Sequence, residues 1–209
     1  MITLYGTYPS RSNRAQWVLE ELELPYRFVV LDFAAGDAHS DTFRALNPAG
    51  KIPVLQHEDL TLTESGAICN YLATLKPEAG LMPSGDSAMR AKYDQWMFFA
   101  QTELEQPMWT KAKHKFALPR EYRVDGLGAT TAFEFSTALD ILSAGLGDQE
   151  FILGGQFTAA DIMLTHTLGW AKIARFKIEH DNVNNYISRN LARPAVARMD
   201  GHERIPFTQ

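Results

Sequence analysis

The sequence predicts a chain of two parts, an α/β region followed by an all-helical region. Three observations support this. Hydrophobic periodicity alternates between strand and helix over residues 1–76, in the order β-α-β-α-β-β-α. Residues 77–85 hold two prolines and two glycines with no periodicity, which is typical of a linker. Residues 86–209 then show almost no strand pattern.

The first elements follow from residue type and spacing. "ITLY" is a short β pattern, and in "RSNRAQWVLEELEL" the apolar residues Ala15, Val18, Leu19 and Leu22 share one helical stripe. Pro25 is expected to close that helix. "YRFVVLDF" is rich in β-branched and aromatic residues and predicts the second strand.

A second helix and a hairpin complete the α/β region. "DAHSDTFRALNP" predicts a short helix that ends at Asn47-Pro48. "PVLQH" and "LTLTE" flank Glu58-Asp59, so we expect an antiparallel hairpin. The apolar positions of the helix after it are Ile68, Tyr71, Leu72 and Leu75.

The helical region contains several amphipathic segments. Residues 86–115 form one long helical pattern, and a second long helix is expected to end at "SAGLGD". "FTAADIMLTHTLGWAKIA" begins with the capping-box pair Thr158 and Asp161, preceded by Phe157 as a staple residue. It is apolar on nearly every face, which predicts the central helix of a bundle. Shorter helical pieces, split at Pro194, follow it.

Composition excludes several classes of function. The 209 residues carry a net charge of −5, which disfavours binding to nucleic acid or to anionic membranes. The single cysteine excludes a disulfide framework, and the six histidines lack metal-ligand spacing. No apolar run approaches bilayer length, and "MITLY" enters a strand with no leader pattern. We therefore expect a cytoplasmic protein without a metal.

The segment "NPAGKIPVLQHEDLTLTESGAICNYL" combines two uncommon features. A cis bond before Pro53 would turn the main chain of Ile52 outward, where an extended peptide can pair with it, although a trans strand-start proline is the more common arrangement. Ser65 is a suitable N-cap, and the small residues after it leave N–H groups accessible to a carboxylate. Glu64 beside it suits an ammonium group. The pair thus matches an α-amino-acid head group.

These motifs resemble the cytosolic glutathione transferases. "NPAGKIPVL", "LTLTESGAICNYL" and "FTAADIML" carry the resemblance, which covers nearly the whole chain. It implies a thioredoxin-like domain (1–76), a linker (77–85) and a helical-bundle domain (86–209). It also implies that Ile52 binds the cysteinyl main chain of glutathione beside a cis Pro53, and that Glu64 and Ser65 hold the γ-glutamyl head. Lys51 is the candidate for the glycyl carboxylate, with His39 as a weaker helper.

The chemistry requires a hydroxyl near the glutathione sulfur. Lowering a thiol pKa by two units from about 8.5 requires about 2.7 kcal/mol, and one hydrogen bond to a charged group supplies about 1.5–3 kcal/mol. Ser10 stands four residues before Arg14, the relation found in serine-type transferases, and is our first candidate. Ser12 is the second, and Tyr8 or Tyr5 would serve in a different register.

The lone Cys69 lies between core positions of a helix and is expected to be buried and inert. A second, hydrophobic substrate is expected between the domains, against the helix of residues 93–109. Aromatic residues at helical spacing are more often core, so these side chains are weak candidates for its pocket: Tyr93, Trp96, Phe99, Met108 and Trp109.

The sequence therefore predicts a homodimeric glutathione transferase acting on a small hydrophobic electrophile, with peroxidase or isomerase side activity left open. The alternative is a non-catalytic binding protein of the same fold, associated with translation or transcription. The complete set Lys51, Pro53, Glu64 and Ser65 favours the enzyme, because a scaffold does not need a peptide clamp.

Overall fold

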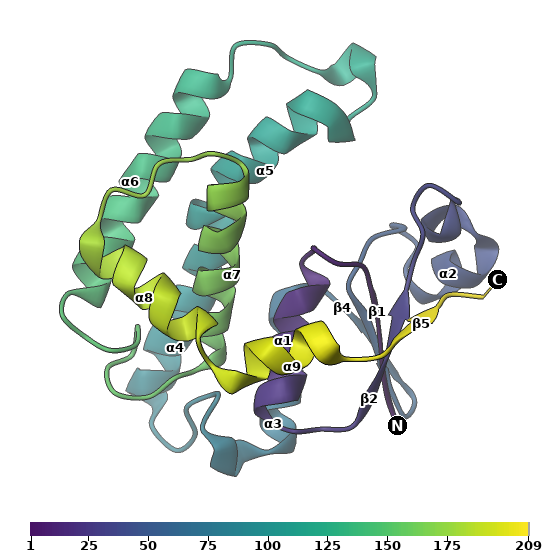
Figure 1. The fold of residues 1–209 in the computed structure, drawn as a ribbon, viewed down its shortest axis with the longest axis horizontal. Coiled ribbons are helices and arrows are strands. Elements are labelled where there is room, and N and C mark those ends of the chain that lie inside the picture. The colour runs from purple at the N-terminus through teal and green to yellow at the C-terminus, as the bar shows by residue number, and fades with distance from the viewer. Residues whose placement is uncertain (209) are drawn as a thin grey trace. The chain divides into compact units, whose positions relative to one another are not determined.

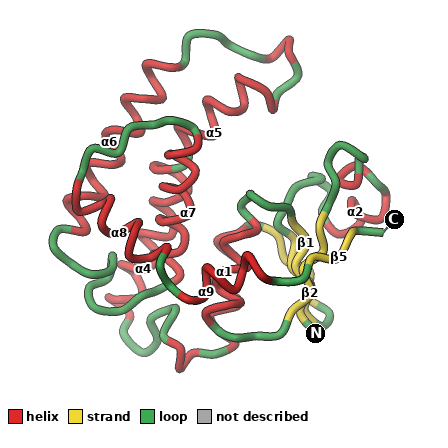
Figure 2. Tube along the Cα trace, in the orientation of Figure 1, coloured by secondary structure: helices red, strands yellow, loops and turns green. Residues whose placement is uncertain are grey.

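The computed structural model describes residues 1–208 and divides into two compact units. The first comprises residues 1–82 together with the C-terminal segment that starts at Ala192. The second comprises Pro83–Leu191. Figure 1 shows the mixed sheet of the first unit and the helices of the second. The strands in Figure 2 all belong to the first unit.

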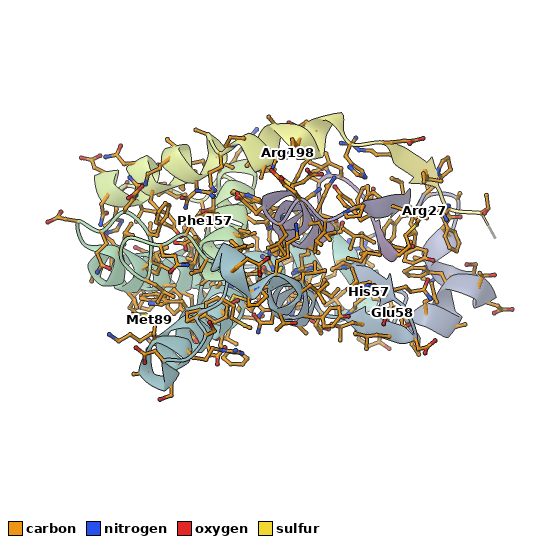
Figure 3. All side chains as sticks on the ribbon, turned by 90° about the horizontal axis from the view of Figure 1, so that it is seen from below. Arg27, His57, Glu58, Met89, Phe157 and Arg198 are labelled. Atoms are coloured by element: carbon orange, nitrogen blue, oxygen red, sulfur yellow. The ribbon has the colours of Figure 1, made fainter. Side chains whose placement is uncertain are left out.

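A five-stranded mixed sheet with the order β4-β3-β1-β2-β5 forms the centre of the first unit. β1 pairs with β2 in parallel and with β3 antiparallel, β4 closes a hairpin with β3, and β5 adds to β2 in parallel. Figure 3 labels His57 and Glu58 at the hairpin turn. The strands are β1 (Ile2–Gly6), β2 (Tyr26–Val30), β3 (Val54–His57), β4 (Leu60–Thr63) and β5 (Arg204–Pro206).

Helices cover both faces of this sheet (Figure 1). α1 (Ser12–Glu21), α3 (Ser65–Leu75) and α9 (Pro194–Gly201) lie on one face, where α1 contacts both of the others. α2 (Asp41–Leu46) lies on the opposite face. Leu4 in β1 and Phe28 in β2 are fully buried, so strand residues supply the centre of the core. The predicted order β-α-β-α-β-β-α and the thioredoxin-like fold are confirmed.

The C-terminal segment departs from the predicted domain boundary. Residues 192–209 were expected to belong to the helical domain, but α9 packs on α1 and β5 extends the sheet. Gln16 donates to the carbonyl of Met199 (3.3 Å), and Arg198 donates to the carbonyl of Glu20 (2.6 Å). Figure 3 labels Arg198. The expectation was wrong because a three-residue strand is too short to show periodicity.

The second unit is helical, as predicted. Its longest helix ends before Gly147, near the expected "SAGLGD" stop. The predicted single helix over 86–115 is instead interrupted by two π-helical segments. Pro107 lacks an N–H and fits only the first turn of a helix, which explains why a new helix begins after the first of them. The α-helices are α4 (Ser87–Phe99), α5 (Gln106–Ala112), α6 (Gly128–Leu146), α7 (Ala159–Ile173) and α8 (Asp181–Leu191), and the π segments are η3 (Ala100–Leu104) and η4 (Lys113–Ala117).

The predicted capping box is present at the start of α7. Asp161 accepts from the Thr158 N–H at 2.8 Å, from the Thr158 hydroxyl at 2.9 Å and from the Ile152 N–H at 2.8 Å. The buried Tyr186 of α8 donates to the same carboxylate at 2.8 Å. One buried side chain thus fixes the start of α7, the preceding loop and α8.

Within residues 1–208, short 3₁₀ turns occupy three loops. η1 (Asp37–His39) precedes α2, η2 (Pro77–Ala79) lies in the predicted linker, and η5 (Arg120–Tyr122) lies between α5 and α6.

Candidate functional site

Strand register brings the predicted site segments to one end of the sheet. Tyr5 of β1 pairs with Val54 of β3, and Val54 pairs with Thr63 of β4. β1 therefore ends, β3 begins and β4 ends at the same margin. The Thr7–Arg11 loop, the Ile52–Pro53 pair and the Glu64–Ser65 pair all leave the sheet there.

The loop before α1 holds two serine hydroxyls in direct contact. Ser10 Oγ donates to the Thr7 carbonyl at 2.7 Å, and Ser12 Oγ lies 3.0 Å from the same oxygen. Ser10 Oγ and Ser12 Oγ also form a short hydrogen bond with each other. The Ser12 N–H donates to Ser10 Oγ at 3.1 Å, and the Ser10 N–H donates to Asn13 Oδ1 at 2.9 Å. The two hydroxyls therefore form one network.

Burial distinguishes the two serines. Ser12 is fully buried over Gly6, where a Cβ would lie 2.2 Å from Ser12 Oγ, so only glycine fits there. Ser10 is only partly buried. Ser10 is thus the more accessible of the two hydroxyls.

The alternative tyrosines lie in different surroundings. Tyr5 is in β1, and its hydroxyl donates to Gln56 Oε1 at 2.7 Å. Burial raises the Tyr5 pKa, an effect that the positive charge of Arg27 partly offsets. Tyr8 is 49% exposed, and its ring lies 5.0 Å from the guanidinium carbon of Arg204 in β5.

The Glu64–Ser65 pair stands at the start of α3. The prediction that Ser65 is the N-cap was wrong: α3 begins at Ser65, and Glu64 is the N-cap residue without a side-chain cap bond. The Ser65 hydroxyl instead accepts from Arg14 Nη1 at 3.2 Å. Arg14 is fully buried in α1, so it connects the α1 loop to the start of α3.

Glu64 has an unusual backbone conformation. Its φ of 66° and ψ of 114° are angles that L side chains rarely adopt, and its side chain is exposed. Such conformations cost about 1–3 kcal/mol and concentrate at ligand clamps. By helix geometry, the N–H groups of Ser65, Gly66 and Ala67 lack acceptors within α3. Glu64 therefore directs a carboxylate to a place beside potential donors.

Lys51 follows a tight turn that Asn47 stabilises. Asn47 Nδ2 donates to the Lys51 carbonyl at 2.7 Å, and its Oδ1 accepts from the Ala49 N–H at 3.1 Å. A Cβ at Gly50 would lie 2.7 Å from the Ala38 carbonyl and 3.9 Å from His39 Nδ1. His39 therefore lies beside this turn, as expected, and also contacts Arg44 Nη2 at 3.3 Å.

The Ile52–Pro53 peptide bond is cis, as the resemblance implied, and so is Tyr8–Pro9, which was not predicted. Pro53 precedes β3 instead of starting it, and β3 lies between β1 and β4, so it is not an edge strand. Ile52 lies two residues before the ladder, which begins at Val54. Its partly buried side chain packs on an apolar cluster that includes Leu31, Ala38, Phe43 and Val54.

Cys69 lies in α3 and is fully buried. Burial raises the pKa of its thiol to about 12, although the charge of Arg14 acts in the opposite direction. The expectation that this cysteine is inert agrees with its position.

The five second-substrate candidates lie on α4 and α5. Tyr93 and Met108 are buried, Trp96 is 9% exposed, and Phe99 and Trp109 are intermediate. Trp96 packs edge-on against Phe99, with ring centroids 5.1 Å apart, and covers Gly145 of α6. Most of this group therefore packs inside the helical unit, and its role toward a substrate stays a prediction.

Residues 1–208 contain neither a metal-binding cluster nor a membrane-spanning helix. Within that range, no group of three or more His, Cys, Asp or Glu side chains could hold a metal ion. No helix in the same range is long and apolar enough to cross a membrane.

Sequence reasoning missed some residues of this margin. Asn13, which fixes the Ser10 main chain, is one of them, and its position three residues after Ser10 is a signal that could have revealed it. Arg204 and Phe207 had no such signal, because their contacts are distant in sequence.

The mixed sheet, the cis-proline before β3 and the helix start at the same margin place the first unit in the thioredoxin-like class of proteins. Family models give the specific assignment. Residues 1–74 match the model described as "Glutathione S-transferase, N-terminal domain", and residues 134–189 match "Glutathione S-transferase, C-terminal domain".

Individual relatives agree. Glutathione S-transferase 3 of Schizosaccharomyces pombe is 33% identical over 77% of this chain and 70% of that protein. The crystal structure of a glutathione transferase from Methylococcus capsulatus has a TM-score of 0.85 at 29% identity, covering 96% of this chain and 98% of the other. A glutathione transferase homolog from Sulfitobacter, solved with bound glutathione, has a TM-score of 0.84 at 26% identity, covering 96% and 97%.

The chain therefore belongs to the glutathione S-transferase family. The predicted enzyme class, a glutathione transferase, is confirmed over the alternative of a non-catalytic scaffold.

Proposed function

We propose that this chain is a serine-type glutathione transferase in which Ser10 stabilises the glutathione thiolate. The observation that carries the proposal is the convergence of the Ser10 loop, Ile52 and Glu64–Ser65 at one sheet margin. The Arg14–Ser65 hydrogen bond supports it, because it connects α1, the helix that follows the Ser10 loop, to the start of α3.

Burial supports Ser10 over Ser12, because Ser12 is fully buried and Ser10 is only partly buried. Two hydroxyl protons serve three contacts: Ser10 to Thr7, Ser12 to Thr7, and the contact between the two serines. When glutathione binds, the Ser10 hydroxyl exchanges its bond to the Thr7 carbonyl for one to the sulfur, and Ser12 keeps that carbonyl paired. Ser10 then donates to the sulfur, while the Ser12 N–H holds Ser10 Oγ in place.

The reaction then needs no general base at Ser10. The hydroxyl favours the anionic form of the bound thiol, so the thiol proton is released to solvent. A sulfur lone pair forms a carbon–sulfur bond with the electrophile, and the leaving group departs with the electron pair of the broken bond. Ser10 keeps its own proton throughout.

The remaining site residues would bind the rest of the tripeptide. The Ile52 main chain pairs with the cysteinyl residue, the carboxylate of Glu64 holds the γ-glutamyl ammonium, and the start of α3 with Ser65 holds its carboxylate. Lys51, with His39 beside its turn, binds the glycyl carboxylate as a point charge.

The proposal also covers location, oligomeric state and substrate. We place the enzyme in the cytoplasm, as a homodimer that acts on a small hydrophobic electrophile. Family membership supports the dimer. Light scattering on the purified chain measures the oligomeric state, and a monomer would contradict this part.

Titration calorimetry with glutathione tests the clamp. We expect binding by the wild type and a large loss of affinity in the Glu64→Ala/Ser65→Ala double variant, because both recognise the γ-glutamyl head. Lys177→Ala is the matched control, since Lys177 is an exposed residue of the helical unit whose side chain is 87% exposed. Equal affinity in the wild type and the double variant would contradict the assigned clamp.

A further inference from the structure

Backbone pairing fixes the segment after α9 to the sheet of the first unit. Arg204, Ile205 and Pro206 of β5 align in parallel with Phe28, Val29 and Val30 of β2. The Phe207 N–H then donates to the Val30 carbonyl at 2.9 Å. Figure 1 shows β5 along this edge of the sheet. The positions of the side chains at 204 and 207 are therefore set by the sheet.

Both of these side chains contact elements of the site. The Arg204 guanidinium carbon lies 5.0 Å from the centroid of Tyr8, two residues before Ser10. The Phe207 ring packs edge-on against Tyr5 (6.2 Å) and Phe43 (5.8 Å). Phe207 packs against the same apolar cluster as Ile52, whose main chain is assigned to the cysteinyl residue.

We propose that β5 is a positioning element of the glutathione site, in which Arg204 holds Tyr8 and thereby the Thr7–Ser10 turn, while Phe207 supports Ile52. This inference rests on the proposed function. The C-terminal segment thus has a role in a site whose first residues lie near the N-terminus of the chain.

The physical reason lies in the exposure of Tyr8. Its ring is 49% exposed, so Arg204 supplies a specific contact that orders a side chain at the surface. An exposed cation–π contact corresponds to about a two- to fivefold change in an equilibrium. Ordering the turn before glutathione binds reduces the conformational entropy lost on binding, and it keeps the Ser10 hydroxyl aimed at the sulfur.

Four variants of the full-length protein test this role. Arg204→Ala is expected to raise KM for glutathione about two- to fivefold and to raise the pKa of the bound thiol by about half a pH unit. Tyr8→Leu should give the same changes, and the double variant should be no worse than either single variant. Arg204→Lys keeps the cation and should retain most of the effect.

Two controls separate positioning from stability and from direct catalysis. Arg198→Ala removes a charge from the same C-terminal segment and breaks its contacts with Glu20, so it should lower thermal stability without changing the thiol pKa. Tyr8→Phe keeps the ring and should behave as the wild type. A thiol pKa raised by Tyr8→Phe would show that the tyrosine hydroxyl itself acts on the sulfur, which would overturn the inference.

Comparison with Ser10→Ala keeps the two proposals distinct. If Ser10→Ala raises the thiol pKa and Arg204→Ala does not, the positioning role is wrong and the proposed function stands. Additive effects of Arg204→Ala and Tyr8→Leu would also overturn the positioning role. If the wild type forms no glutathione thiolate at neutral pH, the proposed function itself fails.

Discussion

At the residue scale, Glu64 combines backbone strain with a proposed ligand contact. Its φ of 66° favours glycine, yet the chain places a carboxylate there. This cost is consistent with a side chain retained for binding and not for stability. Ser10 and Ser12 also differ in role. The buried Ser12 completes the turn, while the partly buried Ser10 remains accessible to a ligand.

The strain at Glu64 gives a prediction with opposite signs for stability and binding. Glu64→Gly is expected to keep or raise the free energy of unfolding, by up to about 1 kcal/mol, because glycine adopts positive φ freely. The same variant should lose affinity for glutathione. Urea unfolding and calorimetry measure the two quantities. Glu64→Ala is the matched control, since it removes the carboxylate but keeps the strain. A destabilised Glu64→Gly variant would contradict this account.

Cys69 is predicted to make stability depend on alkaline pH. Burial raises the pKa of its thiol to about 12, from 9.0 in a solvated thiol. Between these values the unfolded chain releases the thiol proton and the folded chain retains it. The free energy of unfolding therefore falls as pH rises above about 9, by up to about 1.4 kcal/mol per pH unit from this group.

Cys69→Ala tests that dependence by comparison with the wild type. Other groups also titrate at alkaline pH, so the difference between the two unfolding curves is the quantity to measure. We expect the variant to show a shallower decline. Identical slopes would mean that the thiol is not buried in its neutral form.

At the element scale, α7 depends on a single carboxylate. Asp161 accepts four hydrogen bonds, from two N–H groups and two hydroxyls, and burial raises its pKa despite these bonds. Removing it leaves those donors unpaired in the interior. Each unpaired buried group costs about 1–3 kcal/mol.

Asp161→Ala is accordingly expected to reduce the free energy of unfolding by about 3 kcal/mol or more, or to prevent folding of the helical unit. Urea unfolding followed by circular dichroism measures this change. Asp148→Ala, at an exposed position near the same loop, should change the free energy by less than about 0.5 kcal/mol. A loss below about 1 kcal/mol for Asp161→Ala would contradict the role of this network.

Sequence patterns predicted elements well where local rules decide the structure. The capping box needs only Thr158 and Asp161 at the right spacing, and the strands of the hairpin are marked by alternation around Glu58 and Asp59. The π segments Ala100–Leu104 and Lys113–Ala117 were missed, because a one-residue change in helical hydrogen bonding leaves the apolar pattern nearly unchanged.

The site residues were predictable where they are neighbours in the sequence. The Ile52–Pro53 and Glu64–Ser65 pairs were found from motifs, and the cis bond before Pro53 from resemblance. Two features were not predicted: the Arg14–Ser65 contact, and the N-cap position of α3 at Glu64 instead of Ser65. Both depend on the packing of α1 against α3.

At the scale of the whole molecule, the first unit is built from both ends of the chain. α9 and β5 return to α1 and β2, and Arg193 forms a bidentate ion pair with Glu21 at 2.6 and 2.8 Å. This unit therefore cannot be completed until the C-terminal residues have been synthesised.

Deletion of residues 192–209 tests this organisation. We expect a lower midpoint of thermal unfolding and a loss of glutathione affinity, because the deletion exposes α1 and the edge of β2. Differential scanning calorimetry and a binding titration measure these effects. A truncated chain with unchanged midpoint and affinity would show that the C-terminal segment is dispensable to the first unit.

The pKa of the glutathione thiol in the complex is the most direct test of the central claim. It is obtained from the pH dependence of ultraviolet thiolate absorbance for the wild type, Ser10→Ala and Ser12→Ala. We predict that Ser10→Ala raises this pKa by about one to two pH units and that Ser12→Ala raises it by less. An unchanged pKa in Ser10→Ala, with glutathione still bound, would contradict the account.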